Sequence, residues 1–183
     1  MTSQKNIGIA VATAIAYVLL FELNNYLFSS FAFSKGVDWI FLPSGLRLAF
    51  ILIFVEWGAV GIVLASFAIS FGFYFNGDVV TALGAGVISG TSPLFARLIC
   101  IDKLKLNVDL ASLTPTTLLK VAVVFAVLSP VMHQLWFTFR GHTVDFISST
   151  AVMAVGDLTG TLVVLYATKL LLTFLPTLGA SKA

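Results

Sequence analysis

Seven polar or charged side chains lie inside otherwise apolar stretches of this sequence, and they are the residues best suited to chemistry. They are Glu22, Asn24, Asn25, Arg47, His133, Gln134 and Asp157. A charged group near the centre of a bilayer costs roughly 2.5 to 3.5 kcal/mol, so several such groups at similar depth indicate a shared polar cavity. In that cavity Arg47 would bind a small anionic or polar ligand, and Asp157 would orient it. The alternative is a buried ion pair between Arg47 and Asp157 that fixes helix packing, with Glu22 reaching outward.

The elements that must position these side chains are six apolar stretches, each long enough to cross about 30 Å of hydrocarbon as a helix. With 59% hydrophobic and only 10% charged residues, the chain of 183 residues has too little polar sequence to coat a soluble globule. We therefore expect an all-α, polytopic helical bundle that forms a single domain in the plasma membrane, or the inner membrane of a bacterium. The expected spans are residues 7–28, 39–55, 58–75, 79–101, 118–139 and 146–175. The short link at residues 56–58 predicts a tight antiparallel hairpin between the second and third.

The distribution of lysine and arginine predicts the orientation of the bundle. With the N-terminus inside, the outer loops carry only Lys35 and Arg140, whereas the cytoplasmic segments carry Lys5, Lys103, Lys105 and Lys182. The positive-inside rule then places both termini in the cytoplasm.

This orientation brings the polar side chains of four helices to similar depth in the outer half of the membrane. At 1.5 Å of rise per residue, Arg47 lies about 12 Å below the outer end of its helix and Asp157 about 16 Å below that of the last helix. Glu22 lies about 9 Å deep, with Asn24 and Asn25 just above it. The fifth helix places His133 and Gln134 about 8 Å deep. Arg47 and Asp157 are therefore expected to meet.

Glycine and proline positions indicate where helices pack closely or bend. Small residues one turn apart let helix backbones approach each other in lipid, and two glycine pairs have this spacing. They are Gly86 with Gly90 and Gly156 with Gly160. Pro43 is expected at the beginning of the second helix, whereas Pro93 and Pro130 should kink the fourth and fifth.

The sequence does not favour an enzyme. Gly90-Thr91-Ser92-Pro93 invites comparison with the Gly-x-Ser-Gly segment of rhomboid proteases, but Pro93 replaces the second glycine and the last span has no histidine to act as a base. The two histidines, His133 and His142, lack a third metal ligand at a suitable spacing, and the single Cys100 excludes a cysteine cluster. No metal, cofactor or nucleic-acid partner is expected.

Two segments resemble the MASE-type membrane-associated sensor domain, an integral membrane sensory module. They are the stretch from Trp39 to Gly61 around Pro43-Ser-Gly45, and the late Gly156-Asp157-Leu-Thr-Gly160. The resemblance implies a polytopic helical module that receives signals at the membrane, with Pro43, Gly45, Gly156, Asp157 and Gly160 as the matching positions. Members of that family have about eight spans and carry output domains. Six spans and a tail ending at Ala183 therefore imply a short stand-alone form that signals through a separate membrane or cytoplasmic protein.

The alternative is a substrate-binding subunit of a vitamin-type uptake transporter of the energy-coupling-factor class. The chain is similar to such subunits in size, in the expected number of helices and in its inside termini. In those subunits small residues on the first helix, here the register of Ala10 and Ala14, contact a transmembrane partner.

Overall fold

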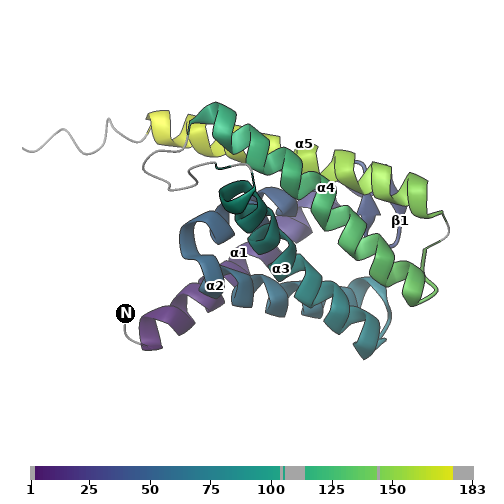
Figure 1. Cartoon of the computed structure of the whole chain (residues 1–183). Helices are drawn as coiled ribbons and strands as arrows, with labels where there is room; N and C mark the ends of the chain where they lie inside the picture. The colour runs from purple at the N-terminus through teal and green to yellow at the C-terminus, as the bar shows by residue number, and fades with distance from the viewer. Residues whose placement is uncertain (1–2, 104, 106–113, 144, 175–183) are drawn as a thin grey trace, which may run out of the picture.

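The computed structural model describes residues 3–103, 105, 114–143 and 145–174, and it is all-α apart from one short hairpin. Helix α1 (Ser3–Phe28) leads through a short 3-10 turn, η1 (Ser29–Phe31), into strands β1 (Ala32–Ser34) and β2 (Val37–Asp38). Then follow α2 (Pro43–Ile69), a π-helical turn η2 (Ser70–Tyr74), α3 (Val79–Asp102), α4 (Pro115–Phe139) and α5 (Phe146–Phe174). In Figure 1, α4 and α5 lie side by side above α1, α2 and α3. Asp109, Lys182 and the end of the sixth expected span at residue 175 lie outside the described residues.

The helices begin where the sequence supplies a cap. Pro43 occupies the first turn of α2, where its missing N–H costs nothing. The carboxylate of Asp78 accepts the backbone N–H of Thr81 at 3.0 Å at the start of α3, and the Thr114 hydroxyl caps α4 in the same way. These caps fix where each helix starts and therefore which residues face the bundle.

Five helices in the described part of the chain, not the expected six, are long and apolar enough to cross a membrane. The second and third expected spans are joined in α2, whose backbone leaves helical geometry at Val55 (φ 47°, ψ −110°). A Cβ on Gly58 would lie 2.6 Å from the Phe50 carbonyl oxygen, although eight positions of a continuous helix would span about 12 Å. The chain therefore turns back on itself at Val55.

The first arm of α2, residues 43–54, is too short to be a span of its own. At 1.5 Å per residue it measures about 18 Å, against about 30 Å of hydrocarbon. The expectation of a helix over residues 39–55 is wrong at its start, because Pro43 opens the helix and residues 39–42 approach it in non-helical conformation. Residues 56–69 form the second arm, which η2 extends to Tyr74.

The bundle has two distinct ends. At one, which we call the hairpin end, Phe21 of α1 packs against Phe73, Asp78 at the start of α3 pairs with Arg140 after α4, and Gly36 of the hairpin approaches Phe137. At the opposite end, Cys100 of α3 packs near Val121 of α4 in an apolar cluster. The buried core between the ends consists mainly of this cluster and of a second one around Ile51 and Ile62.

The glycine pairs lie at close backbone contacts. A Cβ on Gly86 or Gly90 would meet the backbone carbonyls of Val63 and Ala59 at 2.9 and 2.8 Å, so these glycines let α3 approach the second arm of α2. Gly156 and Gly160 bring α5 directly against the backbone of residues 38–42.

Candidate functional site: a buried ion pair beneath two cavities

Arg47 and Asp157 meet inside the bundle. An Nη atom of Arg47 lies 2.7 Å from Asp157 Oδ1, and the two side chains are 1% and 0% exposed. The other Nη lies 3.4 Å from the Ser129 hydroxyl. The rings of Phe41 and Phe125 lie 5.4 and 5.3 Å from the guanidinium carbon, within the range of cation–π attraction. The pair is therefore neutralised, hydrogen-bonded and enclosed by aromatic rings.

Ser44 holds Asp157 in this position. The Ser44 side-chain oxygen lies 2.7 Å from the Asp157 carbonyl oxygen and 3.2 Å from the Thr161 hydroxyl. The Phe41 backbone N–H also donates to the Gly156 carbonyl at 3.2 Å. These bonds attach the residues around the start of α2 to the middle of α5 and so fix the main chain of Asp157 beside Arg47.

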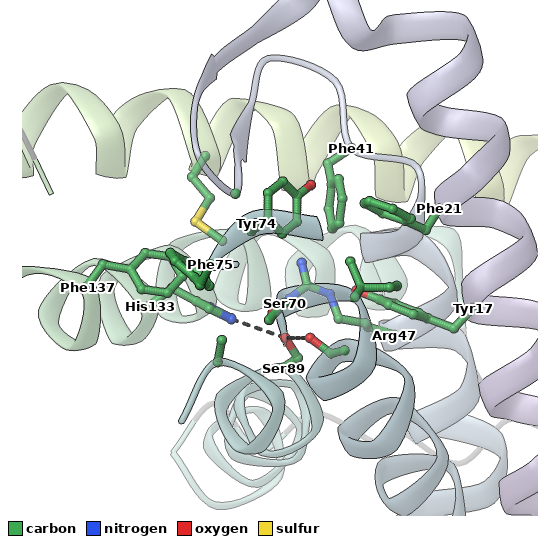
Figure 2. Close-up of a pocket in the computed structure, with 15 residues that line it drawn as sticks. Tyr17, Phe21, Phe41, Arg47, Ser70, Tyr74, Phe75, Ser89, His133 and Phe137 are labelled. Carbon is green, nitrogen blue, oxygen red and sulfur yellow. Dashed lines mark hydrogen bonds between the residues drawn. The ribbon is translucent and has the colours of Figure 1, made fainter. Parts of the chain in front are cut away.

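A small inner cavity borders Arg47. It measures about 40 Å3, and its lining includes Tyr17, Phe21, Arg47, Ser70, Ser89 and His133 (Figure 2). Pockets for small organic ligands usually measure roughly 300 to 1,000 Å3, whereas one water needs about 10 to 15 Å3. The inner cavity therefore has room for a few water molecules only.

Polar side chains around the inner cavity form a directed chain of hydrogen bonds. His133 Nδ1 lies 2.9 Å from the Ser129 carbonyl oxygen, which can only accept, so Nδ1 carries the proton and Nε2 of a neutral ring accepts. Ser89 then donates to His133 Nε2 at 3.2 Å, and Ser66 donates to Ser89 at 2.8 Å. The chain ties α2, α3 and α4 together beside the inner cavity (Figure 2).

A larger outer cavity lies at the hairpin end. It measures about 390 Å3, and Phe21 and Tyr74 line both cavities and so form the wall between them. In Figure 2 the rings of Phe21, Phe41 and Tyr74 stand in a row above Arg47. The other polar side chains of the outer cavity are those of Asn24, Asn25, Ser29, Ser34, Lys35, Asp38 and Asn76.

Asp38 is the carboxylate of the outer cavity. Burial raises its pKa from 3.8 to about 6, and the negative charge of Asp157 adds to this effect, while a hydrogen bond with Tyr74 lowers the pKa. Lys35 lines the same cavity but forms no ion pair with Asp38, and Arg47 is paired with Asp157. Asp38 is therefore a carboxylate with little to stabilise its charge.

Apolar side chains fill the bundle on the far side of Arg47. The next buried residue of the same helix, Leu48, belongs to a cluster with Leu52, Cys100, Val121 and Phe125, all at most 6% exposed. The second cluster, around Ile51 and Ile62, closes the side next to α1. Among the described residues, these apolar clusters therefore close the bundle beyond the inner cavity and the ion pair.

The other residues expected at the site divide between the cavities and the packing. Asn25 lines the outer cavity and His133 the inner one. Asn24 is buried, and its Oδ1 accepts the Leu42 backbone N–H at 2.8 Å, which fixes the approach to α2. Gln134 is buried between Met153 and Thr143 and lines neither cavity.

Glu22 does not join the site. Its side chain is exposed and lines neither cavity, because Tyr17, Phe21 and Asn24 define the buried face of α1 and position 22 points away from it. The expected depth of Glu22 did not place it in the site, because the side chain points away from the interior of the bundle.

The sequence reasoning missed Asp38, Tyr74, Tyr17, Ser66 and Ser89. Asp38 follows a short polar stretch and resembles an ordinary loop residue, so no sequence signal marks it. Tyr17 had a usable signal, since it shares a helix face with Phe21 and Asn24. The serines are common in membrane helices and single ones indicate nothing by themselves.

Comparison of the chain with protein-family models, with curated proteins and with solved structures finds no match. The resemblance to MASE-type sensor domains therefore stays a prediction, and the geometry of the cavities carries the functional argument.

Proposed function

We propose that this protein is a membrane-embedded receptor of the sensor type, which binds a small polar ligand in the outer cavity and signals through a separate protein. The observation that carries the proposal is a cavity of about 390 Å3 at the hairpin end, with an aromatic and polar lining, which Phe21 and Tyr74 separate from the inner cavity beside the buried ion pair. Its volume lies in the usual range for small-ligand sites. A cavity at one end of the bundle suits a receptor better than a channel, which needs a polar route to both ends.

The charge distribution supports an outward-facing cavity. Lys5, Lys103 and Lys120 lie at the end opposite the hairpin, whereas Asp38, Asp78 and Asp145 lie at or near the hairpin end. By the positive-inside rule the lysine-rich end faces the cytoplasm. Ligand would then enter from outside the cell.

In this proposal Arg47 and Asp157 are structural, and the outer cavity takes over the ligand-binding role expected of them. The guanidinium is paired, bonded to Ser129 and enclosed by two rings, and the space beside it admits only water. The pair, with the bond from Arg47 to Ser129, holds α2, α4 and α5 together on the inner side of the ligand cavity.

One of the features behind the uptake-subunit alternative, the alanine register of the first helix, does not lie on a free surface. Ala10 is buried against Gly61 of α2, so the Ala10 register faces the bundle and is not available to a transmembrane partner. This placement favours the receptor proposal.

A thermal-shift screen of small polar compounds on the detergent-solubilised protein tests the proposal. A ligand at 100 times its Kd stabilises the folded state by about 2.7 kcal/mol. Hits should stabilise wild type and the control variant Leu23→Phe, whose side chain is exposed on α1, but not Asn25→Phe, which fills part of the outer cavity. Hits that stabilise Asn25→Phe as strongly as wild type would contradict a ligand site in this cavity.

A further inference from the structure

The outer cavity contains a carboxylate that has no cationic partner among the residues that the structure describes. Asp38 lines the cavity, and the ion pairs between described residues are those of Arg47 with Asp157 and of Asp78 with Arg140 and His142. Lys35 lines the same cavity without pairing with Asp38. A buried carboxylate is costly unless it gains an opposite charge or hydrogen bonds. The local chemistry thus favours a cation brought by a ligand.

Three aromatic rings form the wall beside this carboxylate. The ring centroids of Phe21, Phe73 and Tyr74 lie 5.1 to 5.8 Å apart in edge-to-face pairs, and all three residues line the outer cavity. Asp38 and these three rings line the same cavity, which places the aromatic cluster near the carboxylate. Faces of aromatic rings attract organic cations, and ammonium groups are commonly held by this combination of rings and a negative charge.

We infer that the outer cavity recognises the ammonium group of a small organic amine, with Asp38 as its counter-ion and the Phe21, Phe73 and Tyr74 rings around it. This inference rests on the proposed receptor function and names the ligand class of the same cavity. Two kinds of ligand share the chemistry: a simple amine needs Asp38 alone, whereas an amino acid would also place its carboxylate near Lys35. The amides of Asn25 and Asn76 supply further hydrogen bonds.

The test uses three phenyl compounds that differ only in charge. Phenethylamine carries the ammonium group, phenylalanine carries both charges and 3-phenylpropionate carries only the carboxylate. Their affinities for the purified full chain in lipid nanodiscs are measured by calorimetry at pH 7.5, where Asp38 is ionised. We expect phenethylamine and phenylalanine to bind and 3-phenylpropionate not to bind.

The variants locate the charge that matters. Asp38→Asn keeps the size of the side chain and should weaken phenethylamine binding at least tenfold, because the ammonium group loses its counter-ion. Asp145→Asn removes a negative charge at the start of α5, outside both cavities, and should leave the affinity unchanged. Lys35→Gln should weaken the binding of phenylalanine but not that of phenethylamine if the cavity recognises an amino acid. Equal phenylalanine affinities in wild type and Lys35→Gln indicate that it recognises a simple amine.

The outcomes separate this inference from the receptor proposal. Equal phenethylamine affinity in wild type and Asp38→Asn overturns the ammonium site. Binding of 3-phenylpropionate alone, lost in Asn25→Phe, also overturns it but leaves the receptor proposal standing. The ammonium site and the receptor proposal are both overturned if Asn25→Phe abolishes the binding of none of these three compounds and of no hit from the thermal-shift screen.

Discussion

Removing the carboxylate of the buried pair tests the central contact of the structure. In Asp157→Ala the Arg47 guanidinium keeps only the Ser129 hydroxyl, at 3.4 Å, and the rings of Phe41 and Phe125. With 1% of its side chain exposed, Arg47 cannot recover this loss from solvent. Breaking one partner of a buried ion pair costs about 3 to 5 kcal/mol. For a chain of this length, roughly 2 to 4 °C per kcal/mol gives a fall in Tm of about 6 to 20 °C.

The assay is thermal unfolding in detergent, with Glu22→Ala as the matched control. Glu22 is also a carboxylate on an apolar helix, but it is exposed, so its removal should change the free energy of unfolding by no more than about 0.5 kcal/mol. The double variant Arg47→Met with Asp157→Leu should recover most of the stability, because an apolar pair of similar volume is often as stable as a buried ion pair. A loss below about 1 kcal/mol in Asp157→Ala, or a double variant no better than the single one, would refute the reasoning.

Three further predictions concern other contacts, each measured by thermal unfolding. Ser89→Ala should cost about 1 to 3 kcal/mol because it breaks the hydrogen-bond chain to the histidine, whereas Ser92→Ala should be nearly neutral, since that buried hydroxyl has no partner among the described residues. Gly160→Ala should cost about 1 to 3 kcal/mol, because its Cβ would overlap the backbone before α2, whereas Gly8→Ala meets nothing within 4 Å and should be neutral or stabilising. The pKa of Asp38 is raised to about 6 in the folded chain, so the folded state binds this proton more tightly than the unfolded state does. The free energy of unfolding should therefore fall by at most about 3 kcal/mol as the pH rises from about 4 to about 6. Asp38→Asn should lack this fall. A pH profile of Asp38→Asn parallel to that of wild type would contradict the last of these.

The meeting of Arg47 and Asp157 was predictable because the cost of a lone charge in lipid leaves few arrangements other than pairing. Depth alone sufficed for these two residues, since both had to face inward. Depth failed for Glu22, which can turn outward near the membrane surface, because the rise along a helix says nothing about direction around it.

The number of spans was not predictable from hydropathy. The short link at residues 56–58 did predict a reversal, and the structure places it at Val55. Hydropathy alone could not show that Pro43 starts the helix late, which leaves the first arm too short to be a span. Asp38 was equally hidden, because its partial burial depends on the packing of the hairpin against α5, a tertiary contact that the sequence around Asp38 does not indicate.

The contact of Gly156 and Gly160 with residues 38–42 has a mechanical consequence. Main chain touches main chain there, and no rotatable group lies between the two segments to absorb a displacement. The segment that bears Asp38 and the helix beneath it consequently move as one stiff body. A shift that begins at the cavity mouth is carried from Gly160 along the rest of α5 to Phe174, about 21 Å, toward the end of the bundle opposite the hairpin.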